Sequence, residues 1–198
     1  MKKLLLIGIL FSTFSSLHAQ NKTSFGIGAG INIANVSDNY NGESHSYTDK
    51  VGFKGYVFAD MQLAKYFSIE TDLGYDGMGF KFDDQSLGSV SQAINYLTLS
   101  ILPKIHIKQS GIAFFGGPAL GFKLNSVVSG NGNSVSNSDS YTSMDVFGVI
   151  GMEYFSPVGL GISFRVMPGF TNIVKDTGGD ESVHNVVIGF SLAYRFQN

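Results

Sequence analysis

The sequence contains no cysteine among its 198 residues. Without thiols the chain can form no disulfide, carry no lipid on a cysteine and offer no thiolate to a metal ion. It also has only four prolines, against 25 glycines and 26 residues of Phe and Tyr (17 Phe, 9 Tyr). Glycine and aromatic residues together suit curved β structure, because glycine relieves crowding where strands bend.

Charge is scarce as well. Charged residues make up 14% of the chain, as 13 basic and 15 acidic side chains, and they form no basic stripe. Proteins that bind nucleic acid carry their basic residues on one patch or face. Nucleic acid is therefore not an expected partner.

The chain lacks an apolar run long enough for a membrane-spanning helix, which needs about 20 residues. Its longest apolar stretch follows Lys2 and Lys3 and ends before Ala19. A charged start, a short apolar core and a small residue at the cleavage point are typical of a secretory signal peptide. We predict that residues 1–19 are a signal peptide and that residues 20–198 form one exported domain.

Sustained helical periodicity is also missing after residue 20, and alternation with a period of two replaces it. In the closing segment Phe190, Leu192 and Tyr194 alternate with the small residues Ser191 and Ala193. Such alternation predicts a β-strand with one apolar face. Eight segments show it: residues 24–36, 51–62, 67–82, 93–107, 112–124, 143–155, 160–173 and 185–198.

The predicted connections alternate in length. Residues 63–66, 108–111 and 156–159 are short turns, whereas residues 37–50, 83–92, 125–142 and 174–184 are long and polar. Outer-membrane barrels have short turns at one end and long loops at the other, and each strand needs about 9–11 residues to cross the hydrocarbon. We predict an all-β fold, an eight-stranded antiparallel up-and-down transmembrane β-barrel.

The apolar faces carry large side chains and almost no charge, which suits lipid, whereas the opposite faces carry glycine, alanine and the charged residues. An eight-stranded barrel is just wide enough to be filled by side chains, and buried charges need partners. We therefore predict an interior ion network that plugs the lumen, with a narrow polar conduit as the alternative. Its predicted members are Lys54, Asp60, Glu70, Asp72, Asp76, Lys104, His106, Lys123, Asp145, Glu153, Arg165 and Arg195.

Aromatic residues gather beside the short turns. Barrels in outer membranes carry girdles of aromatic side chains at their interfaces with water. The predicted periplasmic girdle consists of Tyr66, Phe67, Tyr154, Phe155, Tyr194 and Phe196.

Three prolines fall inside predicted strands: Pro103, Pro118 and Pro168. Proline cannot donate a ladder hydrogen bond. We expect bulges or local breaks in the ladders at these positions.

No catalytic or metal-binding constellation stands out. His106 has Ser100 upstream, but it fits the interior network better than a nucleophile–base pair. His45 and His184 lie on predicted long loops beside acidic residues. We interpret them as ordinary polar residues of solvent-exposed loops and not as metal ligands. We predict no catalytic residue, no metal site and no cofactor.

The stretch "INYLTLSILPKIHIKQSGIAFFGGPALGFKL", residues 94–124, resembles the core of the outer-membrane β-barrel domain family of Bacteroidota, often labelled PorT-like. Members have a Tyr-Leu-x-x-Pro strand, a short turn and a Gly-Pro strand. Here Tyr96-Leu97 lies further from Pro103, and Gly117-Pro118 matches the second element. The resemblance implies an eight-stranded outer-membrane barrel and transfers no catalytic or ligand residue.

These observations lead to a functional hypothesis. The protein is expected in the cell outer membrane as a small, non-enzymatic barrel with a plugged polar interior. It would act through its extracellular loops, in binding, adhesion or envelope integrity, or as an accessory to an envelope or secretion machine. Its expected partners are outer-membrane lipid, the barrel-assembly machinery and an unidentified extracellular or envelope protein. Two alternatives stay open: a barrel enzyme that modifies envelope lipid, and a soluble periplasmic barrel that binds an apolar ligand inside.

Overall fold

A computed structural model describes residues 22–39, 47–84, 88–108, 110–175 and 182–196 of the chain. The predicted signal peptide lies outside the described residues. Within them, no helix is long and apolar enough to cross a membrane.

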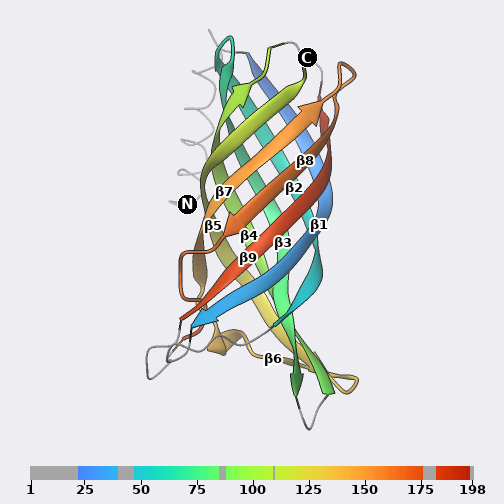
Figure 1. The fold of residues 1–198 in the computed structure, drawn as a ribbon, viewed down its shortest axis with the longest axis vertical. Helices are drawn as coiled ribbons and strands as arrows, with labels where there is room; N and C mark the ends of the chain where they lie inside the picture. Colours follow the sequence, from blue (N-terminus) through green and yellow to red (C-terminus); the bar gives the residue numbers. More distant parts are fainter. Residues whose placement is uncertain (1–21, 40–46, 85–87, 109, 176–181, 197–198) are drawn as a thin grey trace, which may run out of the picture.

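The described chain is a sheet of nine antiparallel strands, eight of which close into a tall ring (Figure 1). Around the ring the order is β1, β2, β3, β4, β5, β7, β8 and β9, and β9 pairs back with β1. The strand β6 pairs only with β5 and lies outside the ring. The strands are β1 Thr23–Asn39, β2 Thr48–Ala64, β3 Phe67–Asp84, β4 Gly88–His106, β5 Ile112–Gly130, β6 Asn133–Ser136, β7 Met144–Phe155, β8 Leu160–Pro168 and β9 Ser182–Arg195.

Alternation along each strand separates the two sides of the ring. In β4 the outward residues Leu97, Leu99 and Ile101 are 37–49% exposed, whereas the inward Thr98 and Ser100 are each 1% exposed. The other ring strands follow the same rule, so the outside of the ring is a band of exposed apolar side chains. This facing is the opposite of what a soluble barrel with an apolar interior ligand requires, and it overturns that alternative.

Glycines on the inner face of β1 make room for aromatic rings on β2. Gly26 lies directly opposite Phe58, and Gly28 lies directly opposite Tyr56. A Cβ atom on either glycine would come within 2.2–2.3 Å of the facing ring. The glycine-rich start of the first strand therefore reflects packing of the narrow lumen.

The short-turn end matches the predicted connections. Residues 65–66, 107–108 with 110–111, and 156–159 lie between the strands there. Gly111 (φ 74°) and Gly159 (φ 86°) adopt the left-handed conformation that other residues rarely take. These two turns therefore depend on glycine.

The long-loop end differs from the prediction. The segment predicted as a loop over residues 83–92 is mostly strand, because β3 and β4 stay paired from Phe67↔Ile105 to Asp84↔Gly88. The loop predicted over residues 125–142 contains the end of β5, the strand β6 and the short 3₁₀ helix η2 Ser138–Ser140. The polar composition of these segments hid their strands, because the buried face of the extension carries polar residues such as Gln92 and Ser126.

The prolines interrupt the ladders as predicted. The β4–β5 pairing stops between Ser100↔Ala119 and Lys104↔Phe115, which leaves Pro103 and its neighbours without partners on β5. β8 ends at Pro168, five residues earlier than predicted. Beyond it, only an isolated bridge at Gly169 continues the pairing with β7.

Candidate functional site

The interior of the ring near its short turns holds a cluster of five charged side chains. The buried Lys104 Nζ contacts the carboxylate of Glu70 and lies 2.7 Å from Glu153 Oε1. Arg195 Nη2 lies 3.3 Å from Asp60 Oδ2 and 3.6 Å from the same Glu153 oxygen. Each carboxylate thus has at least one cation in contact, which is the condition for keeping such charges out of water.

Two further ion pairs lie deeper in the lumen. Arg165 Nη1 donates to Asp72 Oδ2 over 3.0 Å, and its guanidinium lies 5.0 Å from the centre of the Tyr56 ring. Lys54 stands directly opposite Asp76, with 2.7 Å between Nζ and Oδ1. Arg165, Lys54 and both carboxylates are at most 2% exposed. The middle of the lumen is therefore filled by paired charges and rings.

His106 is not part of an ion pair among the described residues. Its Nε2 lies 2.8 Å from Ser68 Oγ. Ser100, the serine considered from the sequence, instead stands opposite Asp72 on the neighbouring strand. Ser68 is 1% exposed and, like His106, lies in the wall of the cavity at the short-turn end.

Two other predicted members also lie apart from the network. Lys123 Nζ donates to the backbone carbonyls of Ser138 and Tyr141 in the β6–β7 connection. Asp145 is fully buried and accepts a hydrogen bond of 2.8 Å from Asn185 Nδ2. Neither has an ion-pair partner of opposite charge among the described residues. Alternation placed these residues inward but could not show which strands bring partners within reach.

The lumen becomes largely apolar towards the long loops, although Asp145, Asn185 and Gln92 are also buried there, each at most 2% exposed. Towards the long loops it is filled by a cluster of apolar side chains that includes Met78, Phe80, Ile94, Phe147 and Met167, each at most 7% exposed. The interior is therefore more apolar at this end than the predicted plugged polar interior. The apolar cluster comes from strand segments that continue beyond the ion pairs.

Two connections close the long-loop end over this cluster. Tyr141 and Val174 form a β-bridge between them, and Thr142 N donates to Ile173 O over 2.8 Å. The Ile173 side chain is fully buried. Burial also raises the pKa of Tyr141 to about 12, so its hydroxyl stays protonated at neutral pH.

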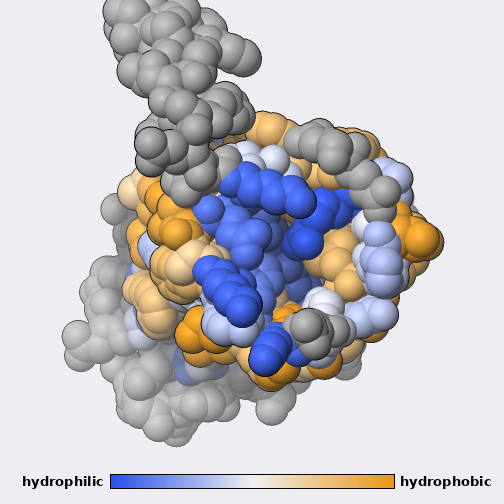
Figure 2. Space-filling view, turned by 90° about the horizontal axis from the view of Figure 1, so that it is seen from above, coloured by the Kyte–Doolittle hydropathy of each residue, from blue (hydrophilic) through white to orange (hydrophobic). Residues whose placement is uncertain are grey.

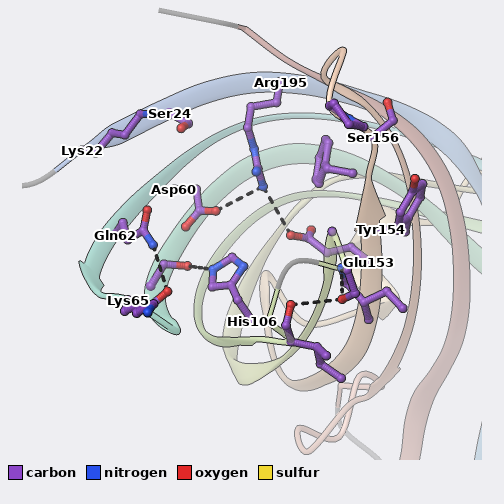
Figure 3. Close-up of a pocket in the computed structure, with 17 residues that line it drawn as sticks. Lys22, Ser24, Asp60, Gln62, Lys65, His106, Glu153, Tyr154, Ser156 and Arg195 are labelled. Carbon is purple, nitrogen blue, oxygen red and sulfur yellow. Dashed lines mark hydrogen bonds and ion pairs between the residues drawn. The ribbon is translucent and has the colours of Figure 1, made fainter.

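The opposite end is open. Figure 2, which views the barrel from its short-turn end, shows hydrophilic residues lining a hollow inside an apolar rim. The hollow, here called the vestibule, is a cavity of about 500 Å³. Its charged lining residues and its histidine are shown in Figure 3: Lys22, Asp60, Lys65, His106, Glu153 and Arg195. Lys22 and Lys65 lie at strand ends and were missed from the sequence, because alternation says nothing about residues beyond a strand.

Three carboxylates at the vestibule floor approach one another closely. Asp60, Glu70 and Glu153 each offer an oxygen within 4.8 Å of the others. Lys104 and Arg195 lie among them, at the contacts described above. Because these two cations already supply positive charge among the carboxylates, the arrangement fits an ion network.

Most of the predicted periplasmic girdle lies on the outer surface. Tyr66, Phe67, Tyr154, Tyr194 and Phe196 are 37–43% exposed. The prediction that Phe155 belongs to the girdle is wrong, because its side chain is 8% exposed and points into the barrel. There its ring lies 4.0 Å from the Arg195 guanidinium. Because Tyr154 and Phe155 are consecutive in a strand, only one of them can face outward.

A second group of exposed aromatic residues was missed from the sequence. Phe53, Tyr75, Phe122 and Phe170 are 37–66% exposed. Phe122 and Phe170 lie ten residues beyond the first residues of β5 and β8, respectively. That separation from the short turns matches the length of strand that crosses a bilayer, about 9–11 residues.

Comparisons with known proteins agree with this architecture. The model of the outer membrane protein beta-barrel domain family matches residues 18–175. The crystal structure of Neisserial surface protein A (NspA) superposes with a TM-score of 0.56 at 15% identity, over 88% of this chain and 99% of that chain. Ail, the attachment invasion locus protein of Yersinia pestis, superposes with a TM-score of 0.49 at 15% identity, over 88% of this chain and 97% of that chain. No curated protein matches the sequence significantly.

At 15% sequence identity, the similarity to these solved structures shows a shared fold and no more. The family match covers most of the chain and agrees with the closed ring, the apolar outer band and the filled lumen. In barrels of this kind the short turns face the periplasm and the longer connections face the outside of the cell. The vestibule therefore opens towards the periplasm. The chain belongs to the outer membrane protein beta-barrel domain family, and the protein is a small β-barrel of the outer membrane.

Proposed function

We propose that this protein acts without catalysis, by binding a protein partner at the sheet that extends from the extracellular end of the barrel. The proposal rests on this extension of the sheet. The lumen beneath it is closed by the described residues, so the extension is the surface that remains for binding at this end. A role in adhesion, in envelope integrity or as an accessory of an envelope or secretion machine would all use such a surface.

The extension consists of the ends of β3, β4 and β5 together with β6. β4 has 19 residues, roughly twice the 9–11 that a bilayer requires. At about 3.3 Å per residue, the surplus reaches well beyond the membrane. Figure 1 shows the β3–β4 hairpin and β6 at the end of the molecule opposite the short turns.

The last strand of this extension has a free edge among the described residues. β6 pairs with β5 through Val127↔Ser136 to Gly130↔Asn133 and ends the sheet. All four of its residues are exposed, and Val135 is 63% exposed. An edge strand with unpaired backbone groups can accept a strand from another protein. This edge supports protein binding more directly than any pocket at the extracellular end.

Site-specific photo-crosslinking in living cells tests the proposal. A crosslinking residue at position 135 should give an adduct with a protein, whereas one at the lipid-facing Leu120 should not. Ser134→Pro removes a backbone N–H from β6 and should reduce the adduct, whereas Ser134→Ala keeps that N–H and serves as the matched control. If positions 89, 129 and 135 all fail to yield a protein adduct, the proposed binding role is wrong.

We also propose a family branch, a maturation route and a membrane position for the protein. We place the chain in the PorT-like branch of Bacteroidota barrels, supported by Tyr96-Leu97 and Gly117-Pro118. We propose that residues 1–19 are removed as a signal peptide and that the barrel-assembly machinery inserts the rest. The two outer aromatic groups would mark the periplasmic and extracellular interfaces of the membrane, in contact with its lipid.

A further inference from the structure

We propose that the vestibule is a binding site for a small anion of the periplasm, a molecule that carries carboxylate or phosphate groups. This goes beyond the extracellular binding role and concerns the opposite side of the membrane. The proposal rests on a polar cavity that is closed on one side. Its carboxylates already contact cations of the barrel interior, and two lysines at its mouth have no ion-pair partner among the described residues.

The shape of the cavity suits a small ligand. Its volume of about 500 Å³ falls within the range of roughly 300–1,000 Å³ that is usual for ligand pockets. Above it, the ion pairs and the apolar cluster fill the lumen, so the described residues leave access from the periplasm only. A molecule that enters there can be held but cannot pass through.

The carboxylates of the vestibule are engaged by internal cations. Glu153 contacts both Lys104 and Arg195, and Asp60 contacts Arg195. A cationic ligand would have to compete with these contacts. The acidic residues of the vestibule therefore do not favour a cation.

The positive charge at the mouth is unpaired. Lys22 and Lys65 are exposed, and neither has an ion-pair partner among the described residues, although the Lys65 ammonium lies 5.4 Å from the centre of the Tyr66 ring. Arg195, held against the Phe155 ring, keeps 26% of its side chain exposed. Three cations thus surround the opening, while every acidic residue nearby is at most 6% exposed. A cleft whose exposed charges all have the same sign concentrates ions of the opposite sign.

The donors in this arrangement fit an oxyanion. Lysine ammonium groups bind phosphate and carboxylate as point charges, and the planar guanidinium of arginine presents several N–H donors to the same groups. The vestibule also exposes polar groups of Ser24 and Gln62 in its wall. An anion with two or more charged groups could contact the lysines and Arg195 together.

The test is isothermal titration calorimetry on the folded full-length mature barrel in a neutral detergent. Pyrophosphate is the phosphate probe and citrate is the carboxylate probe. Saturable binding of either supports the proposal, and the stronger probe identifies the preferred group. Each of Lys22→Gln and Lys65→Gln should weaken binding about 2- to 5-fold, as expected for the loss of one exposed charge contact, and the double variant should weaken it further.

Lys108→Gln is the matched control. Lys108 is an exposed lysine of another periplasmic turn that does not line the vestibule, so its loss should change affinity less than 2-fold. Heat-modifiable migration on SDS gels verifies that each variant is folded. Absence of saturable binding of both probes, or an equal loss of affinity in the Lys108 variant, overturns the proposal. Either result leaves the extracellular binding role untouched, because the crosslinking experiment measures that role separately.

Discussion

Lys104 is buried between Glu70 and Glu153, so its ammonium group neutralises carboxylates that water does not reach. Removing one partner of a buried ion network leaves the others uncompensated. The cost of that loss exceeds the net stabilisation that the intact network provides. Single residues of the lumen are therefore more sensitive to substitution than the number of contacts suggests.

Lys104→Met should lower the free energy of unfolding by about 3–5 kcal/mol, because it leaves buried carboxylates without their cation. Urea unfolding of the barrel in lipid vesicles, followed by the loss of heat-modifiable migration, measures the change. Lys108→Met, at an exposed turn, should change stability by less than about 0.5 kcal/mol. Equal effects of the two substitutions would contradict the network.

Leu99→Arg should destabilise the barrel by about 2–4 kcal/mol, because Leu99 lies on the outer face of β4 where arginine would meet the bilayer interior. Leu124→Arg, at the long-loop end of the apolar face of β5, should cost only about 0–1 kcal/mol. The same unfolding assay compares them. Normal insertion and stability of the Leu99 variant would refute the outward assignment of this face.

At the scale of elements, the hairpin of β5 and β6 depends on its two-residue turn. Asn131 (φ 49°) and Gly132 (φ 76°) both have positive φ. That combination is typical of the type I′ turn, for which Asn-Gly is a strong sequence signal. The signal was present in the sequence, but it was overlooked because the surrounding residues are polar and do not alternate.

Gly132→Ala should open the hairpin without unfolding the barrel. A side chain in the left-handed conformation costs roughly 1–2 kcal/mol, which corresponds to about a 5- to 30-fold faster local exchange. Hydrogen exchange of the amides in β6 measures this effect. Gly130→Ala is the control, since Gly130 does not have a positive φ and an added Cβ would make only ordinary contact with Val90. An unchanged exchange rate in the Gly132 variant would show that the turn does not hold β6.

For the whole molecule, the lumen changes character along its axis. The periplasmic part is an open vestibule, the middle is filled by ion pairs, and the extracellular part is packed with apolar side chains under two connections. Close packing in this section leaves no continuous path for water or ions.

The barrel should therefore conduct no ions in a planar bilayer. Recordings of the purified protein should show no discrete current steps at either polarity. Replacing Ile173 and Tyr141 together by glycine should still give none, because Phe147 and Met167 remain packed below them. Regular steps in the unmodified protein would restore the narrow polar conduit considered from the sequence.

The sequence by itself determined the class of fold, the eight ring strands, the face of each strand and the short turns. These features follow from local rules, because a period of two sorts side chains between lipid and lumen wherever a strand occurs. It also placed most interior charges on the correct side. The packing of Gly26 and Gly28 against Phe58 and Tyr56 became visible only across strands.

Only the tertiary structure decided which charges meet. It joined Lys104 to Glu70 and Glu153, left Asp145 and Lys123 outside the network, and turned Phe155 inward onto Arg195. It also packed the extracellular part of the lumen mainly with apolar side chains and left the vestibule open below. The reason is that partners in a barrel lie on different strands, far apart in the chain, and their distances depend on strand register and tilt, which alternation along a single strand does not contain.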